Sequence, residues 1–116
     1  MTGDQLARVV VERHGPTVLA RLAGEIDLSN AVAVEDQVVG GLAGATGAAV
    51  DLGGLDYLDS AGLALLSRLA GRLAGMLRLV VPPGATVRRT VEVSGLSAAI
   101  PVDDSVEAAL AALRPS

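Results

Sequence analysis

The chain has 116 residues, enough for one domain but too few for two, and its nine arginines against thirteen acidic residues give a net charge of −4. It contains no Cys, Lys, Trp or Phe and a single His, which excludes disulfides, thiolate and two-His metal sites, a Walker-type phosphate loop, a Schiff-base lysine and a His-based triad. An acidic chain with an aromatic content of 1% is also a poor candidate for nucleic-acid binding.

The beginning of the chain predicts a hairpin followed by a helix. Leu6–Glu12 and Thr17–Ala23 are β-rich runs joined by His14-Gly15-Pro16, which indicates two strands and a tight turn. Ser29 is in position to cap a helix from Asn30 to about Ala43. One face of this helix is predicted to be buried because apolar residues recur on it at helical spacing, namely Ala31, Val34, Val38 and Leu42.

The middle of the chain predicts a buried strand and a second helix. Four glycines within Gly40–Gly47 break the first helix and form a loop. Ala48–Leu52 is a continuous apolar run, typical of a central strand, and Gly53-Gly54 is expected to end it. One residue of the pair Asp59-Ser60 then caps a helix that runs to about Ala74.

The rest of the chain alternates strand and helix. The predicted elements are a strand at Leu77–Val81 stopped by Pro82-Pro83-Gly84, a helix at Ala85–Val93 ending near Gly95, a short edge strand at Ile100–Val102, and a helix capped by Asp104-Ser105 that ends at Leu113. The fold class is therefore α/β in the order ββαβαβα(β)α, with a mixed sheet of four to five strands and about four helices. Residues 1–116 are expected to form a single domain with its core at about 6–113.

The second helix has two contrasting faces. At about 100° per residue, its apolar side carries Leu66, Leu69, Ala70 and Leu73, with Leu63 and Leu65 at the margins. The opposite side carries Ser60, Ala64, Ser67, Arg68 and Gly71. This side is small and nearly flat, which suits it to docking a partner. The same residues on a merely exposed helix would reflect the Ala-rich composition of the chain.

Membrane and export signals are not evident in the sequence. The longest uncharged stretch, Gln37–Val50, has 14 residues and four glycines, which makes it too short and too Gly-rich to span a bilayer. Met1–Asp4 ends in an acid where a signal peptide needs basic residues. We therefore expect a cytoplasmic protein with no direct contact to membrane or nucleic acid. The aliphatic core gives no indication of a cofactor pocket, so no cofactor is predicted.

The most informative stretch is Val50–Leu63, in which a strand leads through a turn into the helix at Asp59-Ser60-Ala61-Gly62-Leu63. This stretch resembles the central motif of the STAS-domain family, specifically of bacterial anti-anti-sigma factors, around their phosphorylated serine. Three further regions carry the resemblance in family order: Gly24-Glu25-Ile26-Asp27, then Leu77-Arg78-Leu79-Val80 with Val87-Arg88-Arg89, then Ser94-Gly95-Leu96 with Ile100-Pro101-Val102. Together the regions span nearly the whole chain.

The resemblance implies the STAS fold and a function in transcription regulation. Such proteins, also called anti-sigma factor antagonists, bind an anti-sigma factor that is a serine kinase, and this binding releases a sigma factor. The kinase phosphorylates the serine that matches Ser60, which ends binding, and a metal-dependent serine/threonine phosphatase restores it. Partner contacts are implied for Asp27, Asp59, Ser60, Ala61 and Gly62. The helical geometry adds Ala64, Ser67 and, at the rim, Arg68.

Other roles stay open for single residues. Asp27 can contribute to the partner surface, cap the turn before the first helix, or do both. Asp59 is expected to combine helix capping with positioning of the serine. Arg88-Arg89 is expected on a solvated helix face, and His14 is interpreted as a turn residue.

Two other functions compete with the antagonist hypothesis. A STAS subunit of another assembly, such as a stress-signalling complex or a lipid-transport system, would share the fold, although the Asp59-Ser60 pair favours the antagonist role. An enzyme with Ser60 as nucleophile is disfavoured because Leu58 replaces the first Gly of Gly-x-Ser-x-Gly and the single His lies in a distant turn. Nucleotide binding is not supported, since Gly40–Gly47 does not open a helix as a phosphate loop does.

Overall fold

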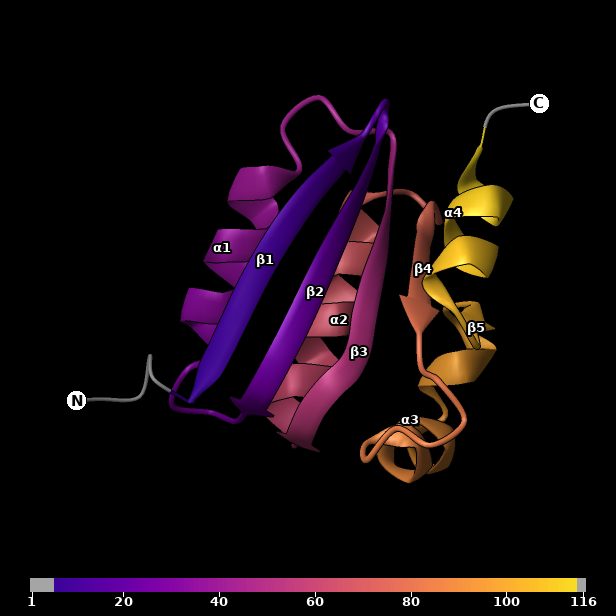
Figure 1. Ribbon diagram of the computed structural model, residues 1–116. Coiled ribbons are helices and arrows are strands. Elements are labelled where there is room, and N and C mark those ends of the chain that lie inside the picture. The colour runs from indigo at the N-terminus through magenta and orange to yellow at the C-terminus, as the bar shows by residue number, and fades with distance from the viewer. Residues whose placement is uncertain (1–5, 115–116) are drawn as a thin grey trace.

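The computed structural model describes residues 6–114 (Figure 1). Met1–Asp4, on which the expectation about export signals rests, lies outside the described residues. The order of elements and the mixed sheet are as predicted, with the optional fifth strand present. The elements are β1 (Ala7–His14), β2 (Thr17–Ile26), α1 (Ala31–Gly41), β3 (Gly47–Leu58), α2 (Ser60–Arg72), β4 (Leu77–Val80), α3 (Arg88–Ser94), the 3-10 helix η2 (Leu96–Ala98), β5 (Val102–Asp103) and α4 (Val106–Leu113).

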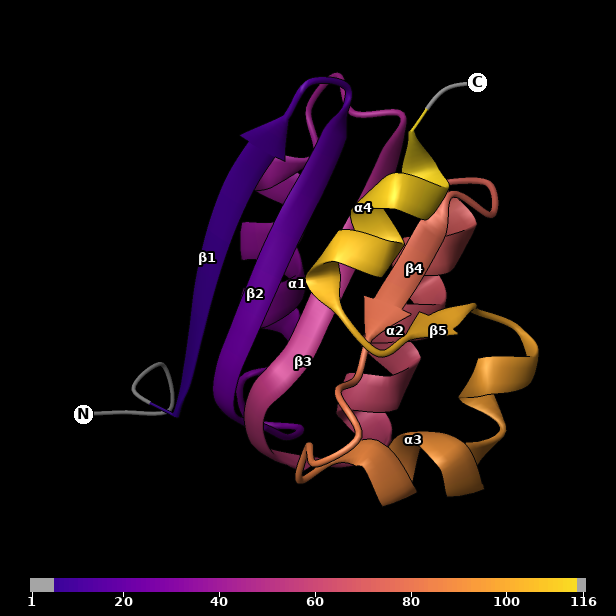
Figure 2. The ribbon, with the colours of Figure 1, turned by 45° about the vertical axis from the view of Figure 1, so that its right-hand side comes forward.

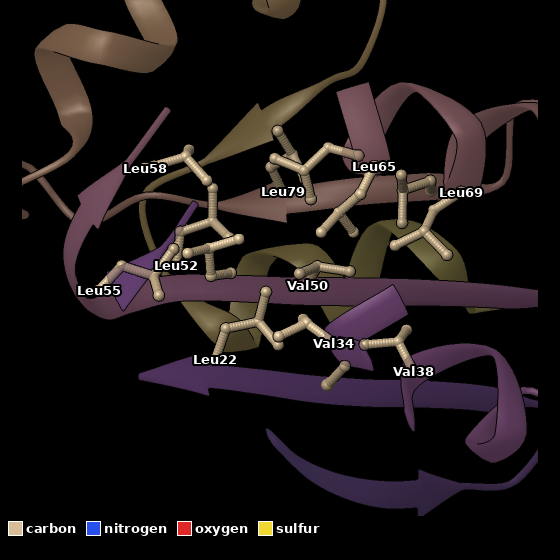
Figure 3. Close-up of a cluster of buried hydrophobic side chains, with 14 of the residues drawn as sticks. Leu22, Val34, Val38, Val50, Leu52, Leu55, Leu58, Leu65, Leu69 and Leu79 are labelled. Atoms are coloured by element: carbon tan, nitrogen blue, oxygen red, sulfur yellow. The ribbon is translucent and has the colours of Figure 1, made fainter. Parts of the chain in front are cut away.

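The strands form one sheet in the order β1-β2-β3-β4-β5, in which β1 is antiparallel to β2 and the other neighbours are parallel. Helices α1 and α2 cover one face, and α4 covers the other over β3 and β4 (Figures 1 and 2). The larger core lies beneath α1 and α2, where Val50 and Leu52 of β3 pack with Val38 of α1 and Leu65 of α2 (Figure 3). A smaller cluster beneath α4 comprises Leu19, Ala49, Val80, Ala109 and Leu113.

Strand β3 is longer than predicted, since it continues past Gly53-Gly54 to Leu58. A register shift against β2 accompanies the glycine pair, and the Asp51 carboxylate accepts a hydrogen bond from the Gly53 N–H at 2.8 Å. The chain therefore bulges here without leaving the sheet. A Cβ on Gly54 would stand 3.1 Å from the Leu22 carbonyl oxygen, so glycine permits the close pairing that keeps the strand going.

The start of α1 also differs from the prediction. The helix begins at Ala31, and Ser29 does not cap it. Both the N–H and the hydroxyl of Ser29 instead donate to the Asp27 carboxylate, at 2.9 and 2.6 Å. The predicted apolar face is buried at Ala31, Val34 and Val38, and Leu42 packs half-buried against the core.

Two elements near the end of the chain are shifted. Helix α3 starts at Arg88 instead of Ala85 because residues 82–88 form consecutive turns, in which the Ala85 N–H donates to the Pro82 carbonyl. Strand β5 is Val102–Asp103 instead of Ile100–Val102, because the Ile100 N–H bonds to the Leu96 carbonyl in the 3-10 turn. Ser105 caps α4 as predicted. No helix in residues 6–114 is both long and apolar enough to cross a bilayer.

Candidate functional site

The predicted site residues meet where β2 and β3 end. These parallel strands finish side by side with Ile26 opposite Leu58, and the Asp59 N–H donates to the Ile26 carbonyl at 3.2 Å. Helices α1 and α2 both begin just beyond this edge. The topology thus brings together Asp27 and Asp59-Ser60, which are far apart in the sequence.

Asp59, and not Ser60, caps α2. One oxygen of its carboxylate accepts hydrogen bonds from the N–H groups of Ala61 and Gly62, at 2.9 and 3.2 Å. Ser60 is the first residue of the helix and is exposed to solvent. Because the Asp59 side chain already satisfies the free N–H groups, the fold does not require the Ser60 hydroxyl as a cap.

The loop between β2 and α1 is held by side chains. Asp27 accepts both hydrogen bonds from Ser29, and its carbonyl accepts the N–H of Ala31 at 2.9 Å. Asn30, only 3% exposed, accepts the Asp27 N–H at 3.0 Å and donates to the Glu25 carbonyl at 2.9 Å. Asp27 therefore shapes this turn, one of the roles that the sequence left open. The part played by Asn30 was missed, because an Asn at a predicted helix start indicates no such loop bond.

The two faces of α2 are arranged largely as predicted. Every residue assigned to its outer side is exposed: Ser60, Ala64, Ser67, Arg68 and Gly71. The buried stripe contains Leu65, Leu66 and Leu69, so Leu65, predicted at the margin of this side, is fully buried. Ala61 is half-buried beside Ser60.

Gly62 is a correction to the predicted contact residues, because it is buried. A Cβ at this position would come within 2.2 Å of Leu58 Cδ1 and 3.2 Å of Ile26 Cγ2. The glycine therefore lets the first turn of α2 lie directly on the strand ends. This close packing determines how far Ser60 lies from the sheet, and Gly62 itself is not accessible to a partner.

Arg68 is fixed by an ion pair to α1. Its Nη2 lies 2.7 Å from Oε1 of Glu35 and its Nε 2.9 Å from the same oxygen, a two-pronged contact. The hydrogen bond from Arg68 holds the pKa of Glu35 below its usual value, and the carboxylate raises the pKa of Arg68. The pair joins the outer sides of the two helices and leaves little net charge between them.

Exposed apolar side chains flank the site on α1. Leu28 is 83% exposed and Val32 68% exposed. Since α1 and α2 each return the chain between parallel strands, they run in the same direction, and the Glu35–Arg68 pair sets their register. One turn before that pair lie Val32 and Ala64. A candidate binding surface is formed by exposed residues of the two helices and of the turn before α1, and we call it the docking face: Leu28, Val32, Ser60, Ala64, Ser67 and Arg68.

The α1 part of this candidate surface was not predicted from the sequence. Leu28 lies between polar turn residues, and Val32 lies off the predicted apolar stripe of its helix. At both positions the sequence has an apolar residue where an exposed residue is predicted, and this pattern could have identified them. Tyr57, the single aromatic residue, is also 50% exposed at the end of β3.

Arg88 was predicted to lie on a solvated helix face, but its side chain is bound to neighbouring elements. Its guanidinium donates to the Val81 carbonyl at 2.5 Å and pairs with Glu92 and Asp104 at 3.2 and 3.4 Å. It therefore ties α3 to the end of β4. Arg89 is exposed on the same helix. His14 ends β1 at the hairpin turn, as predicted, and pairs with Glu12 at 3.4 Å.

An open groove of about 570 Å³ lies between α2 and α3. Its lining residues are Leu63, Thr86, Arg89, Thr90, Val93 and Ser94. In residues 6–114, no group of three or more His, Asp or Glu side chains is gathered closely enough to hold a metal ion.

Known proteins resemble this chain over nearly its full length. The sequence profile of a family described as "Mlab, STAS domain" matches residues 9–111. The anti-sigma-F factor antagonist RsfB of Mycobacterium tuberculosis is 28% identical over 113 residues, which cover 96% of this chain and 92% of RsfB.

Solved structures resemble its fold. A crystal structure of an anti-sigma factor antagonist from Mycobacterium paratuberculosis has a TM-score of 0.85 at 26% identity and covers 99% of this chain and 100% of its own. The antagonist SpoIIAA in its unphosphorylated form has a TM-score of 0.72 at 22% identity, covering 92% and 96% of the two chains. The phosphorylated form of Bacillus SpoIIAA scores 0.64 at 21% identity, with 92% and 100% covered.

Proposed function

Because the chain belongs to the STAS-domain family, we propose that it acts as an anti-sigma factor antagonist whose docking face binds an anti-sigma factor. In this proposal the anti-sigma factor is also the kinase that phosphorylates Ser60, and a serine/threonine phosphatase reverses the modification. The protein acts in the cytoplasm as a substrate and a binding surface, without catalysing a reaction itself. The observation that carries the proposal is an exposed Ser60 on the first turn of α2, next to a carboxylate that already caps the helix.

The position of Ser60 explains how modification can leave the domain folded. A phosphate adds about −1.5 to −2 charges. It would lie beside the amino end of α2, where the helix dipole favours negative charge. The hydroxyl is exposed and the cap is provided by Asp59, so phosphorylation displaces no buried contact. The modified protein is therefore expected to keep its stability.

The composition of the docking face explains how modification ends binding. The face is apolar at Leu28 and Val32 and small at Ala64, and the charge of Arg68 is balanced by Glu35. A partner can cover such a surface at little cost in desolvation. A doubly charged group at its edge must lose hydration when covered, which is unfavourable without a new cation to pair it.

Relatives with this role support the proposal. RsfB and the Mycobacterium paratuberculosis protein are named anti-sigma factor antagonists, and SpoIIAA exists in phosphorylated and unphosphorylated forms. The alternative is a STAS subunit of another assembly, for which phosphorylation of Ser60 is not required. The two roles differ in whether a kinase anti-sigma factor recognises the chain.

The deciding experiment uses the kinase anti-sigma factors of the source organism. Each is incubated with the protein and ATP, and phosphate is located by tandem mass spectrometry. We expect one phosphate, on Ser60, with none on the Ser60→Ala variant and unchanged modification of the Ser97→Ala control, since Ser97 is exposed on η2 outside the docking face. If no such kinase binds or modifies the protein, or if the phosphate lies elsewhere, the proposal fails.

A further inference from the structure

Within residues 6–114, no strand pairs with the outer edge of β1. Strand β1 lies at the end of the strand order, and Figures 1 and 2 both show it with β2 on one side alone. The Leu6 carbonyl accepts the Glu25 N–H from the β2 side at 2.7 Å. Antiparallel pairing alternates, so the even-numbered residues of β1 bond to β2. The backbone groups that point outward are those of Ala7, Val9, Val11 and Arg13.

We infer that β1 pairs with β1 of a second copy of this chain, antiparallel and about a two-fold axis at Val10. An exposed edge strand is a template for pairing with another strand. In this register, residues with outward backbone groups meet each other, which an antiparallel ladder requires. The opposed residues are Val10 with Val10, Val9 with Val11, Arg8 with Glu12, and Ala7 with Arg13.

The side chains of β1 are self-complementary in this register alone. Arg8, Val10 and Glu12 lie on the same face of the sheet as α4, which does not cover that face at this edge. Their partners on β2 are Ala23, Arg21 and Leu19, and Leu19 belongs to the cluster beneath α4. The two-fold places each Arg8 opposite a Glu12, and Val10, which is 54% exposed, opposite its own copy. A shift by two residues would set Val10 against Arg8 or Glu12, and a shift by one would mismatch the backbone groups.

The Glu12 carboxylate already has cationic partners within a single copy of the chain. Its carboxylate lies 3.1 Å from Arg21 Nε and 3.4 Å from His14 Nε2. The hydrogen bond from Arg21, with that from His14, lowers the pKa of Glu12. Arg8 of the second copy would therefore join Arg21 and His14 around the Glu12 carboxylate.

The helix next to this edge is compatible with a second copy. In the two-fold pair the two α1 helices lie on the same sheet face beside each other. Glu35 marks the side of α1 that faces α2. By helical spacing, the opposite side carries Ala33, Gln37 and Gly40, all exposed and uncharged. Ala33 and Gly40 are small and Gln37 is uncharged, which favours close approach of the two helices.

The pairing does not depend on the proposed function. Ser60 begins α2, which packs on β3, whereas the proposed contact lies along β1 on the far side of α1. Both docking faces of the pair stay accessible. The association can thus be tested on the purified chain alone, without kinase or nucleotide.

The test combines charge exchange with mass measurement by light scattering over a concentration series. We expect wild-type protein to approach the mass of two chains, and Arg8→Glu to raise its dissociation constant at least about tenfold, since each copy then opposes like charges twice. Glu12→Arg should do the same, and an equimolar mixture of the two variants should restore the two-chain mass. Arg89→Glu on α3 makes the same charge change away from the edge and should associate like wild type.

Amide hydrogen exchange gives a second readout that does not rely on the variants. Exchange at Val9 and Val11 should slow as the protein concentration rises. The inference is overturned if wild type keeps the mass of one chain up to millimolar concentration. It is equally overturned if Arg8→Glu associates as tightly as wild type, or if the slowed amides lie outside β1.

Discussion

Arg68 of α2 and Glu35 of α1 form a two-pronged ion pair, with Nη2 and Nε at 2.7 and 2.9 Å from the same carboxylate oxygen. The pair joins two helices whose residues form the docking face. It also balances the charge of a surface that a partner would desolvate in the proposed complex. One contact between distant parts of the sequence thus links the two helices of this face and balances its charge.

The pH dependence of this link follows from the lowered pKa of Glu35. Since the folded-state pKa lies below the unfolded value, the pair stabilises the protein above pH 4.5 and its contribution is lost as the pH falls through the folded pKa. We expect the difference in urea midpoint between wild type and Glu35→Gln to be constant near neutral pH and to shrink below pH 4.5. Because the pair is exposed, added salt should also reduce the difference. A difference that grows towards acid would contradict the ion pair.

Ser60→Glu is expected to weaken binding to the anti-sigma factor while leaving the melting temperature close to that of wild type. The new carboxylate lies on an exposed first turn that favours negative charge, yet it must be desolvated in the complex. Ser60→Ala should bind whether or not kinase and ATP are present. Thr46→Glu, at an exposed site before β3 and so at the opposite end of the sheet, is the matched control. Calorimetric titration and thermal melts measure both effects, and a Ser60→Glu variant that binds like wild type would refute the charge argument.

Leu28→Asp and Val32→Asp should each weaken anti-sigma factor binding by about tenfold or more, as expected when an apolar contact in an interface is replaced by a charge. Their free energy of unfolding should change by less than about 0.5 kcal/mol, because exposed side chains have few contacts to lose. Val93→Asp is the control, since Val93 is 72% exposed on α3 and lies outside the docking face. Surface plasmon resonance measures the three affinities. Equal losses at all three positions would argue against a face centred on α1 and α2.

Asp59→Ala should destabilise the protein by about 0.5–2 kcal/mol, since it leaves two N–H groups at the start of α2 without a side-chain partner. Asp59→Asn keeps an acceptor oxygen and should lose much less. Ser60→Ala removes a hydroxyl that does not cap the helix and should lie within about 0.5 kcal/mol of wild type. Urea unfolding of the three variants distinguishes them. A cost at Ser60 as large as that at Asp59 would mean that both residues cap the helix.

Gly24→Ala should be strongly destabilising, by more than about 2 kcal/mol. Gly24 has φ of +93°, and a Cβ there would stand 2.0 Å from the Leu6 carbonyl oxygen, a backbone atom that cannot move aside cheaply. Gly71→Ala is the control, because its Cβ would meet nothing within 4 Å and alanine favours the helix. Thermal unfolding should therefore shift down for the first variant and stay or rise for the second. A Gly24→Ala protein as stable as wild type would mean that β1 and β2 are less closely paired.

Local pattern predicted the element order because each helix and strand carries its own periodicity and end signals. The extent of β3 was not predictable, since the glycine pair that reads as an end is kept in the sheet by its pairing with β2. The choice between Asp59 and Ser60 as cap was also open, because both residue types accept N–H bonds and backbone geometry decides between them.

The candidate site was predicted on α2 and missed on α1 for a related reason. The outer side of α2 can be derived from one helix alone. The Glu35–Arg68 pair depends on how two helices pack across the sheet, which no spacing within either helix indicates. Gly62 was misplaced because its burial depends on Leu58 and Ile26, on two different strands.

The cap provided by Asp59 has a consequence for how long each state of the protein can last. In the proposed cycle, a phosphate is attached to the Ser60 hydroxyl and later removed, while α2 keeps the same terminal hydrogen bonds. Neither state is then a partly opened form that proteases or chaperones would select. The number of antagonist molecules would stay constant over repeated rounds of phosphorylation and dephosphorylation. The ratio of the kinase rate to the phosphatase rate would then set the fraction that is able to bind at any moment.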